Sequence, residues 1–135
     1  EYEPITGRAD FWKDFMVGYD GRYVYSTVRW TMDIWKKNWT SGNYMGCVVY
    51  PGPTTGVTTS IRFETLRDGV EDYDYLALLR QAVDKGEGPA ETLAEAKKIL
   101  ADENIRKEVS KIDGLYAMRT RIADLLAALA GTEGR

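Results

Sequence analysis

The chain has 135 residues, a net charge of −3 and no histidine, and 44% of its residues are hydrophobic. We expect such a chain to form a globular unit with a buried core. Its acidic balance argues against a nucleic-acid-binding protein. The absence of histidine excludes within this chain any mechanism that needs a histidine base or a histidine metal ligand. No apolar run reaches the length of a membrane span, so we expect no membrane partner. We also expect no cofactor and no metal.

The first residues, Glu1 to Pro4, contain no initiator methionine and no apolar stretch typical of a signal peptide. We therefore expect the chain to begin within a longer protein, or at a boundary introduced by processing or cloning. The single cysteine, Cys47, cannot form an internal disulfide. It lies in an apolar run and has no histidine to activate it, so we interpret it as a buried hydrophobic residue.

The first part of the chain is rich in aromatic residues and turns. Apolar residues at helical spacing predict a short helix over Asp10–Tyr19, which Asp20-Gly21 would end. Arg22–Trp30 is rich in Val, Thr and Tyr and is the best candidate strand. Cys47–Tyr50 is a second, shorter candidate, which we expect Pro51 to stop.

A long helix is predicted over Ile61–Lys85, because apolar residues recur there at spacings of three and four. Thr58, Thr59 and Ser60 are all suitable residues to cap its start. Gly69, in the middle of this helix, costs about 1 kcal/mol relative to alanine. We expect the helix to continue through Gly69, with a neighbouring element packed closely against it.

Residues 60–135, which include this helix, contain eleven of the twelve alanines and are typical of helices. A break at 86–88 precedes a helix that Pro89 would open as its first residue. A short turn is expected around Ile105. The last helix would be capped by Asp113 and ended by Gly131.

The densest group of charged side chains lies on the long predicted helix. Three of its carboxylates are four residues apart and share one stripe. They are a candidate acid–base pair or cation site, or a charged face in which arginines act as counter-ions. We favour the structural interpretation, in which loss of Arg67 would cost about 3–5 kcal/mol of stability. The group comprises Arg62, Glu64, Arg67, Asp68, Glu71 and Asp72.

A second group consists of aromatic residues that follow the predicted strand Arg22–Trp30. Flat rings with polar edges stack on sugars and also fill protein cores. Their place beyond the end of a strand favours the wall of a pocket, but the sequence leaves both interpretations open. These residues are Trp30, Trp35, Trp39 and Tyr44.

The stretch from Gly46 to Leu79 carries a specific resemblance. It contains Tyr-Pro-Gly, then a Gly/Thr-rich loop, then the run SIRFETLRDGVEDYDYL. This run resembles a signature of the family 123 glycoside hydrolases, which are β-N-acetylgalactosaminidases, and of their bacterial relatives. The matching positions include Ser60, Arg62, Glu64, Leu66, Arg67, Asp68, Gly69, Glu71, Asp72, Tyr73, Tyr75 and Leu76.

The resemblance implies an α/β fold, namely the C-terminal end of a (β/α)8 TIM barrel followed by extra helices, with a predominantly helical content. Asp10–Tyr19 would be the seventh helix, Arg22–Trp30 the eighth strand and Ile61–Lys85 the eighth helix. Residues 1–86 would form the barrel end, and residues 87–135 a helical extension that packs on it. A periplasmic or extracellular location is also implied.

The resemblance further implies that no catalytic residue lies in this chain, because the family's Asp-Glu pair belongs to an earlier strand. The substrate's own 2-acetamido group is the nucleophile in that family. The chain would supply a sugar-facing wall, although Tyr25 occupies a place where the family tends to have Trp. The expected substrate-binding residues are Tyr25, Arg29, Trp30, Trp35, Trp39 and Tyr44.

Three functions therefore remain open from the sequence. The first is a part of a glycosidase-like enzyme whose partners are a carbohydrate and the rest of the parent barrel. The second is a carbohydrate-binding module without catalysis. The third is a helical structural or interaction domain.

Overall fold

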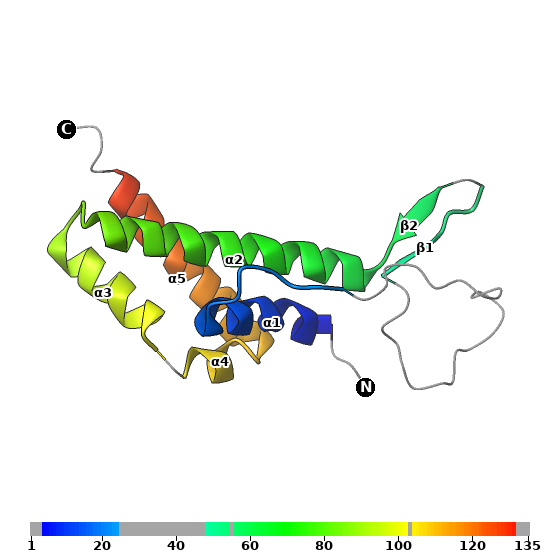
Figure 1. Cartoon of the computed structure of the whole chain (residues 1–135), viewed down its shortest axis with the longest axis horizontal. Helices are drawn as coiled ribbons and strands as arrows, with labels where there is room; N and C mark the ends of the chain where they lie inside the picture. The colour runs from blue at the N-terminus through cyan, green and yellow to red at the C-terminus, as the bar shows by residue number, and fades with distance from the viewer. Residues whose placement is uncertain (1–3, 25–47, 55, 103, 132–135) are drawn as a thin grey trace.

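The protein is predominantly helical, as expected. The structure, a computed structural model, describes residues 4–24, 48–54, 56–102 and 104–131 (Figure 1). In chain order its elements are α1 (Pro4–Val17), β1 (Val49–Pro51), β2 (Val57–Thr59), α2 (Ile61–Lys85), α3 (Ala90–Leu100), α4 (Ile105–Glu108) and α5 (Ile112–Ala130). Within the described residues, no helix is long and apolar enough to cross a lipid bilayer.

The first two long helices lie side by side and run in the same direction (Figure 1). The contacts between them follow the same direction along both helices. Arg8 contacts Asp72 and, two turns later, Phe15 contacts Arg80. The chain after α1 turns back along both helices, where Arg22 pairs with Asp14 and the Tyr73 hydroxyl donates to the Tyr19 carbonyl. Two consecutive parallel helices thus require a returning segment between them.

Helix α5 packs on α2 behind this pair, and α3 and α4 complete the helical layer (Figure 1). The core lies where these helices meet, and its side chains are almost inaccessible to solvent. Burial of such residues is the main favourable contribution to folding. The largest apolar side chains fully buried there are Trp12, Leu76, Leu79, Ile105, Leu115, Ile122 and Val109.

The long helix begins and ends as the sequence predicts. Its N-cap is Ser60, whose hydroxyl accepts from the Phe63 amide. Its C-cap is Gly86, at a φ of 69° that glycine adopts without strain. The predicted close approach at Gly69 is confirmed, because an added Cβ would collide with the ring of Phe11 on α1.

The prediction for α1 is wrong at both ends. The helix begins at Pro4, where a missing backbone N–H is harmless. It ends before Gly18, which has a φ of 79°. The Gly18 amide donates to the Phe15 carbonyl and the Tyr19 amide to that of Asp14. This Schellman pattern stops the helix before the turn expected at residues 20–21.

The predicted strands also need correction. Strand β1 extends to Pro51, which pairs with Val57 at the end of an antiparallel hairpin. Proline fits at this end because the neighbouring Gly52 amide closes the turn onto Gly56. Residues 57–59, expected in a loop, form β2. Of the strand expected at Arg22–Trp30, the structure describes only residues 22–24, which join no described strand.

Two helix starts differ from the prediction by one or two residues. Pro89 is the N-cap of α3 rather than its first residue. Lys111 is the N-cap of α5, and Asp113 lies within its first turn. At this earlier start the Leu115 amide donates to the Lys111 carbonyl, and the Leu115 side chain lies in the core.

Candidate functional site

The charged stripe of α2 turns toward α1 and forms a buried cluster with it. Asp72 is fully buried, and Arg8 of α1 is 3% exposed. Arg8 Nε donates to Asp72 Oδ2 at 2.6 Å, and Arg8 Nη2 donates to Oδ1 at 2.9 Å. This two-point arrangement is the strongest geometry available to an arginine and a carboxylate. The sequence brings the two residues together because the Gly69–Phe11 contact lets the helices approach closely.

Further donors complete the surroundings of Asp72. Trp12 Nε1 donates to Oδ2 at 3.0 Å, and Arg119 Nη1 of α5 lies 3.4 Å from Oδ1. Asp68, one turn earlier, lies 3.6 Å from Arg8 Nη1. Asp72 thus joins α1, α2 and α5 through one carboxylate, which we call the Asp72 cluster (Arg8, Trp12, Asp68, Asp72 and Arg119).

The electrostatics of Arg8 follow from these contacts. Burial acts to lower the pKa of Arg8, but its hydrogen bond to Asp72 and the charges of Asp72 and Asp68 outweigh that effect. The pKa of Arg8 is therefore raised above its ordinary value, and the guanidinium stays charged. Arg8 Cζ lies 5.0 Å from the centre of the Tyr116 ring, a favourable cation–π contact.

The Asp72 cluster is suited to holding helices together. Each carboxylate oxygen of Asp72 already accepts from a donor, and among the described residues no buried polar side-chain atom lacks a partner. A catalytic acid or base needs access to a substrate proton, which a fully buried and fully paired carboxylate does not have. The described part of the chain also contains no group of three or more acidic or cysteine side chains placed to hold a metal.

Arg67 is a counter-ion of the helix's carboxylates, as predicted, but the prediction that it belongs to a buried pair is wrong. Its side chain is 59% exposed, and its partners Glu64, Asp68 and Glu71 belong to the same helix. Exposed pairs of this kind contribute little to stability. The counter-ion of Asp72 is instead Arg8.

The sequence contained a signal for Arg8 that the prediction missed. Arg8 and Trp12 are four residues apart, so on a helix both donors lie on one face. Because the predicted helix began at Asp10, Arg8 fell outside it. The other predicted counter-ion, Arg62, is half-buried near the start of α2.

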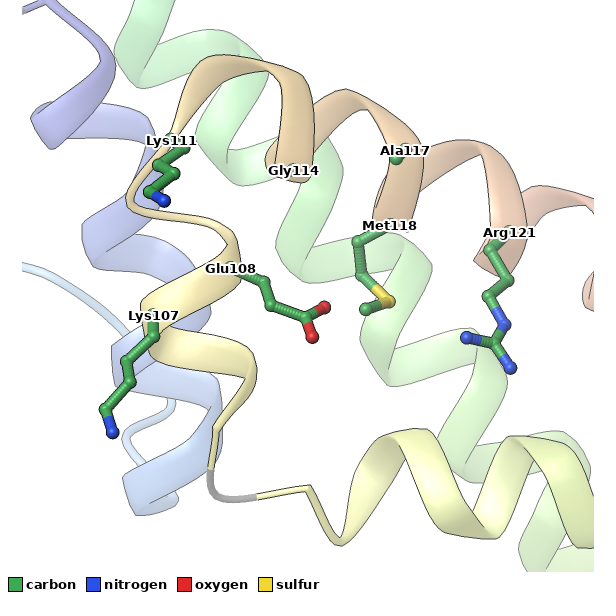
Figure 2. A pocket seen from close by; sticks show the side chains of 7 residues that line it. All are labelled: Lys107, Glu108, Lys111, Gly114, Ala117, Met118 and Arg121. Atoms are coloured by element: carbon green, nitrogen blue, oxygen red, sulfur yellow. The ribbon is translucent and has the colours of Figure 1, made fainter.

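A separate hollow of about 420 Å³ lies between α4 and α5 (Figure 2). The Glu108 side chain points into it, toward Met118, while the Lys107 and Arg121 side chains lie at its sides. Arg121 is already bound to Glu95 of α3 at 2.6 Å. None of the seven lining residues is aromatic, so this hollow lacks the stacking surface expected of a sugar site.

The six residues predicted to bind sugar lie outside the described residues. These are Tyr25, Arg29, Trp30, Trp35, Trp39 and Tyr44. The remaining tryptophan, Trp12, is 1% exposed and belongs to the core. Comparisons with protein-family models, with curated proteins and with solved structures gave no match to this chain.

Proposed function

We propose that this chain is the C-terminal part of a glycoside hydrolase-like, carbohydrate-active protein. In this proposal α1 and α2 are the last two helices of a (β/α)8 barrel, and the catalytic carboxylates belong to an upstream segment. The chain supplies the closing helix and a sugar-facing wall.

The observation that carries the proposal is the parallel packing of α1 and α2 (Figure 1). Helices joined by a short loop pack antiparallel, whereas parallel neighbours need a chain that returns between them. In α/β barrels that returning chain is a strand. The return along α1, marked by the Arg22–Asp14 pair, has the direction that such a strand requires.

The signature residues also support the proposal. Ser60 caps α2, Gly69 admits Phe11, and Asp72 binds α1 and α5. A signature whose residues fix one helix against its neighbours suits a closing segment of a barrel. It does not require catalysis by the segment itself.

The proposed substrate is a glycoside of an N-acetylhexosamine, as the resemblance implies. Trp30, Trp35 and Trp39 would stack on the apolar face of the sugar ring, and Arg29 would hydrogen-bond its hydroxyls. None of these side chains donates a proton near neutral pH, so their contribution is binding.

The test uses the parent protein and 4-nitrophenyl N-acetyl-β-galactosaminide, with the β-galactoside as the control substrate. We expect hydrolysis of the first only. The Trp30→Ala/Trp39→Ala variant should bind the sugar more weakly, with an unchanged pH profile. Trp12→Phe is the control, because it alters a buried tryptophan and should change stability but not affinity. Normal affinity in a folded double variant would refute the sugar-facing wall.

A helical structural or interaction domain is the second candidate. The observation that favours it is the core formed by α1 to α5, which is continuous through all five helices. A parent that binds no sugar and hydrolyses none would select this function. Binding without turnover would select a carbohydrate-binding module.

A further inference from the structure

One face of α2, opposite the core, is exposed and carries both apolar and polar residues. It carries Phe63, Val70 and Leu78, whose exposed fractions are 39%, 49% and 51%. Arg67 and Asp74 lie between them and are also exposed. At 100° per residue these five side chains span an arc of about 80°. We call them the outer stripe of α2.

The outer stripe carries three large apolar side chains on a helix surface that faces solvent. A helix that packs on one side normally carries polar residues on the other. Here the core side already includes Leu76 and Leu79, both fully buried. The three exposed apolar side chains on the outer side of the same helix, interleaved with opposite charges, therefore point to a second packing partner.

The order of residues along the outer stripe is self-complementary. If two copies of α2 pack antiparallel about an axis between residues 70 and 71, Phe63 of each copy faces Leu78 of the other. Arg67 of each then faces Asp74 of the other, and the two Val70 side chains meet beside the axis. The opposite charges of Arg67 and Asp74 therefore face each other in the antiparallel register. In a parallel register each of these residues would face its own copy.

The charged residues of the outer stripe differ in the number of ionic partners they have within one chain. Asp74 makes no ion pair with any described residue. Arg67 has three carboxylate neighbours on its own helix and is the basic residue within the stripe. We propose that the outer stripe of α2 binds a second copy of this chain, antiparallel and with twofold symmetry. The proposal is independent of the proposed carbohydrate function.

Sedimentation over roughly two decades of protein concentration tests the association. We expect a reversible monomer–dimer equilibrium. Val70→Lys places two like charges beside the axis and should raise the dissociation constant by at least about tenfold. Val57→Lys, at an exposed position on β2, is the control with the same chemical change and should leave the dissociation constant unchanged. Circular dichroism verifies that both variants are folded.

Single cysteines in a Cys47→Ser background test the register. Val70→Cys should form a disulfide with itself. Phe63→Cys and Leu78→Cys should form one only when they are mixed, and the exposed Glu87→Cys should form none. A chain that stays monomeric, a dimer insensitive to Val70→Lys, or self-linking of Phe63→Cys would overturn the proposal. So would binding of the stripe to another part of the parent protein in place of a second copy.

Discussion

Replacing Arg8 by methionine tests the Asp72 cluster most directly. The substitution keeps the apolar stem of the side chain and removes the guanidinium. It leaves Asp72, a fully buried carboxylate, without the two hydrogen bonds of 2.6 and 2.9 Å that Arg8 donates. Loss of one partner of a buried pair costs about 3–5 kcal/mol.

The remaining contacts of Asp72 set the expected value within this range. Trp12 Nε1 still donates at 3.0 Å, and Arg119 Nη1 remains at 3.4 Å. We therefore expect the lower end, about 3 kcal/mol. With an m-value near 1.5 kcal/mol/M, the urea midpoint would fall by about 2 M.

The assay is urea unfolding followed by circular dichroism, with Arg67→Met as the matched control. Arg67 undergoes the same chemical change at an exposed position, so its free energy of unfolding should change by no more than about 0.5 kcal/mol. The double variant Arg8→Met/Asp72→Leu removes both charges and should recover most of the loss. If Arg8→Met were as mild as Arg67→Met, the structural role of the cluster would be refuted.

Gly69→Ala should lower the free energy of unfolding by about 1–3 kcal/mol through overpacking, despite its better helix propensity. Phe11→Leu removes the ring that an added Cβ would meet, so it should relieve the loss in a double-variant cycle. Ser60→Ala removes the cap of α2 together with the hydrogen bond that the Ser60 hydroxyl donates to the Val48 carbonyl. It should cost about 1 kcal/mol or more, measured by the same urea titration; an equal loss on Ser60→Thr, which keeps the hydroxyl, would contradict the capping role. The raised pKa of Arg8 means that its contribution to stability is present below its ordinary pKa and is lost only as pH rises above it. The stability difference between wild type and Arg8→Met should therefore stay constant between about pH 7 and 10, and a decline in that interval would contradict the charge assignment.

The sequence predicted best where local chemistry determines the structure. The bounds of α2 follow from a capping serine, an apolar repeat and Gly86, all within the helix or beside it. The close approach at Gly69 was predictable because glycine within a regular helix needs a reason. The mainly helical content followed in the same way from the alanine-rich second half.

The sequence predicted less where contacts between residues far apart in the chain determine the structure. Asp72 and Arg8 are 64 residues apart, and helix periodicity indicates only that Asp72 shares a face with Asp68. Nearby Arg67 looked like the counter-ion because it is close in sequence, but i,i+4 geometry places it on the solvent side of its own helix. The end of α1 was misplaced because Gly18 terminates it through backbone bonds that periodicity does not reveal.

The position of the Asp72 cluster explains how two parallel helices keep one register. An apolar interface alone tolerates sliding, because one buried methyl group can replace another at small cost. A two-point arginine–carboxylate pair tolerates it less, since sliding α1 by one turn would break both hydrogen bonds from Arg8 to the fully buried Asp72 and leave Arg119 as its charged neighbour. The Gly69–Phe11 contact adds a steric restriction three residues from Asp72, where an added Cβ would collide with the Phe11 ring. We therefore expect the pair to contribute more to the specificity of the α1–α2 arrangement than to its stability. The Arg8→Met/Asp72→Leu variant should accordingly regain its free energy of unfolding while the contact between Phe15 and Tyr73, whose ring centres lie 5.3 Å apart, becomes heterogeneous in NMR spectra.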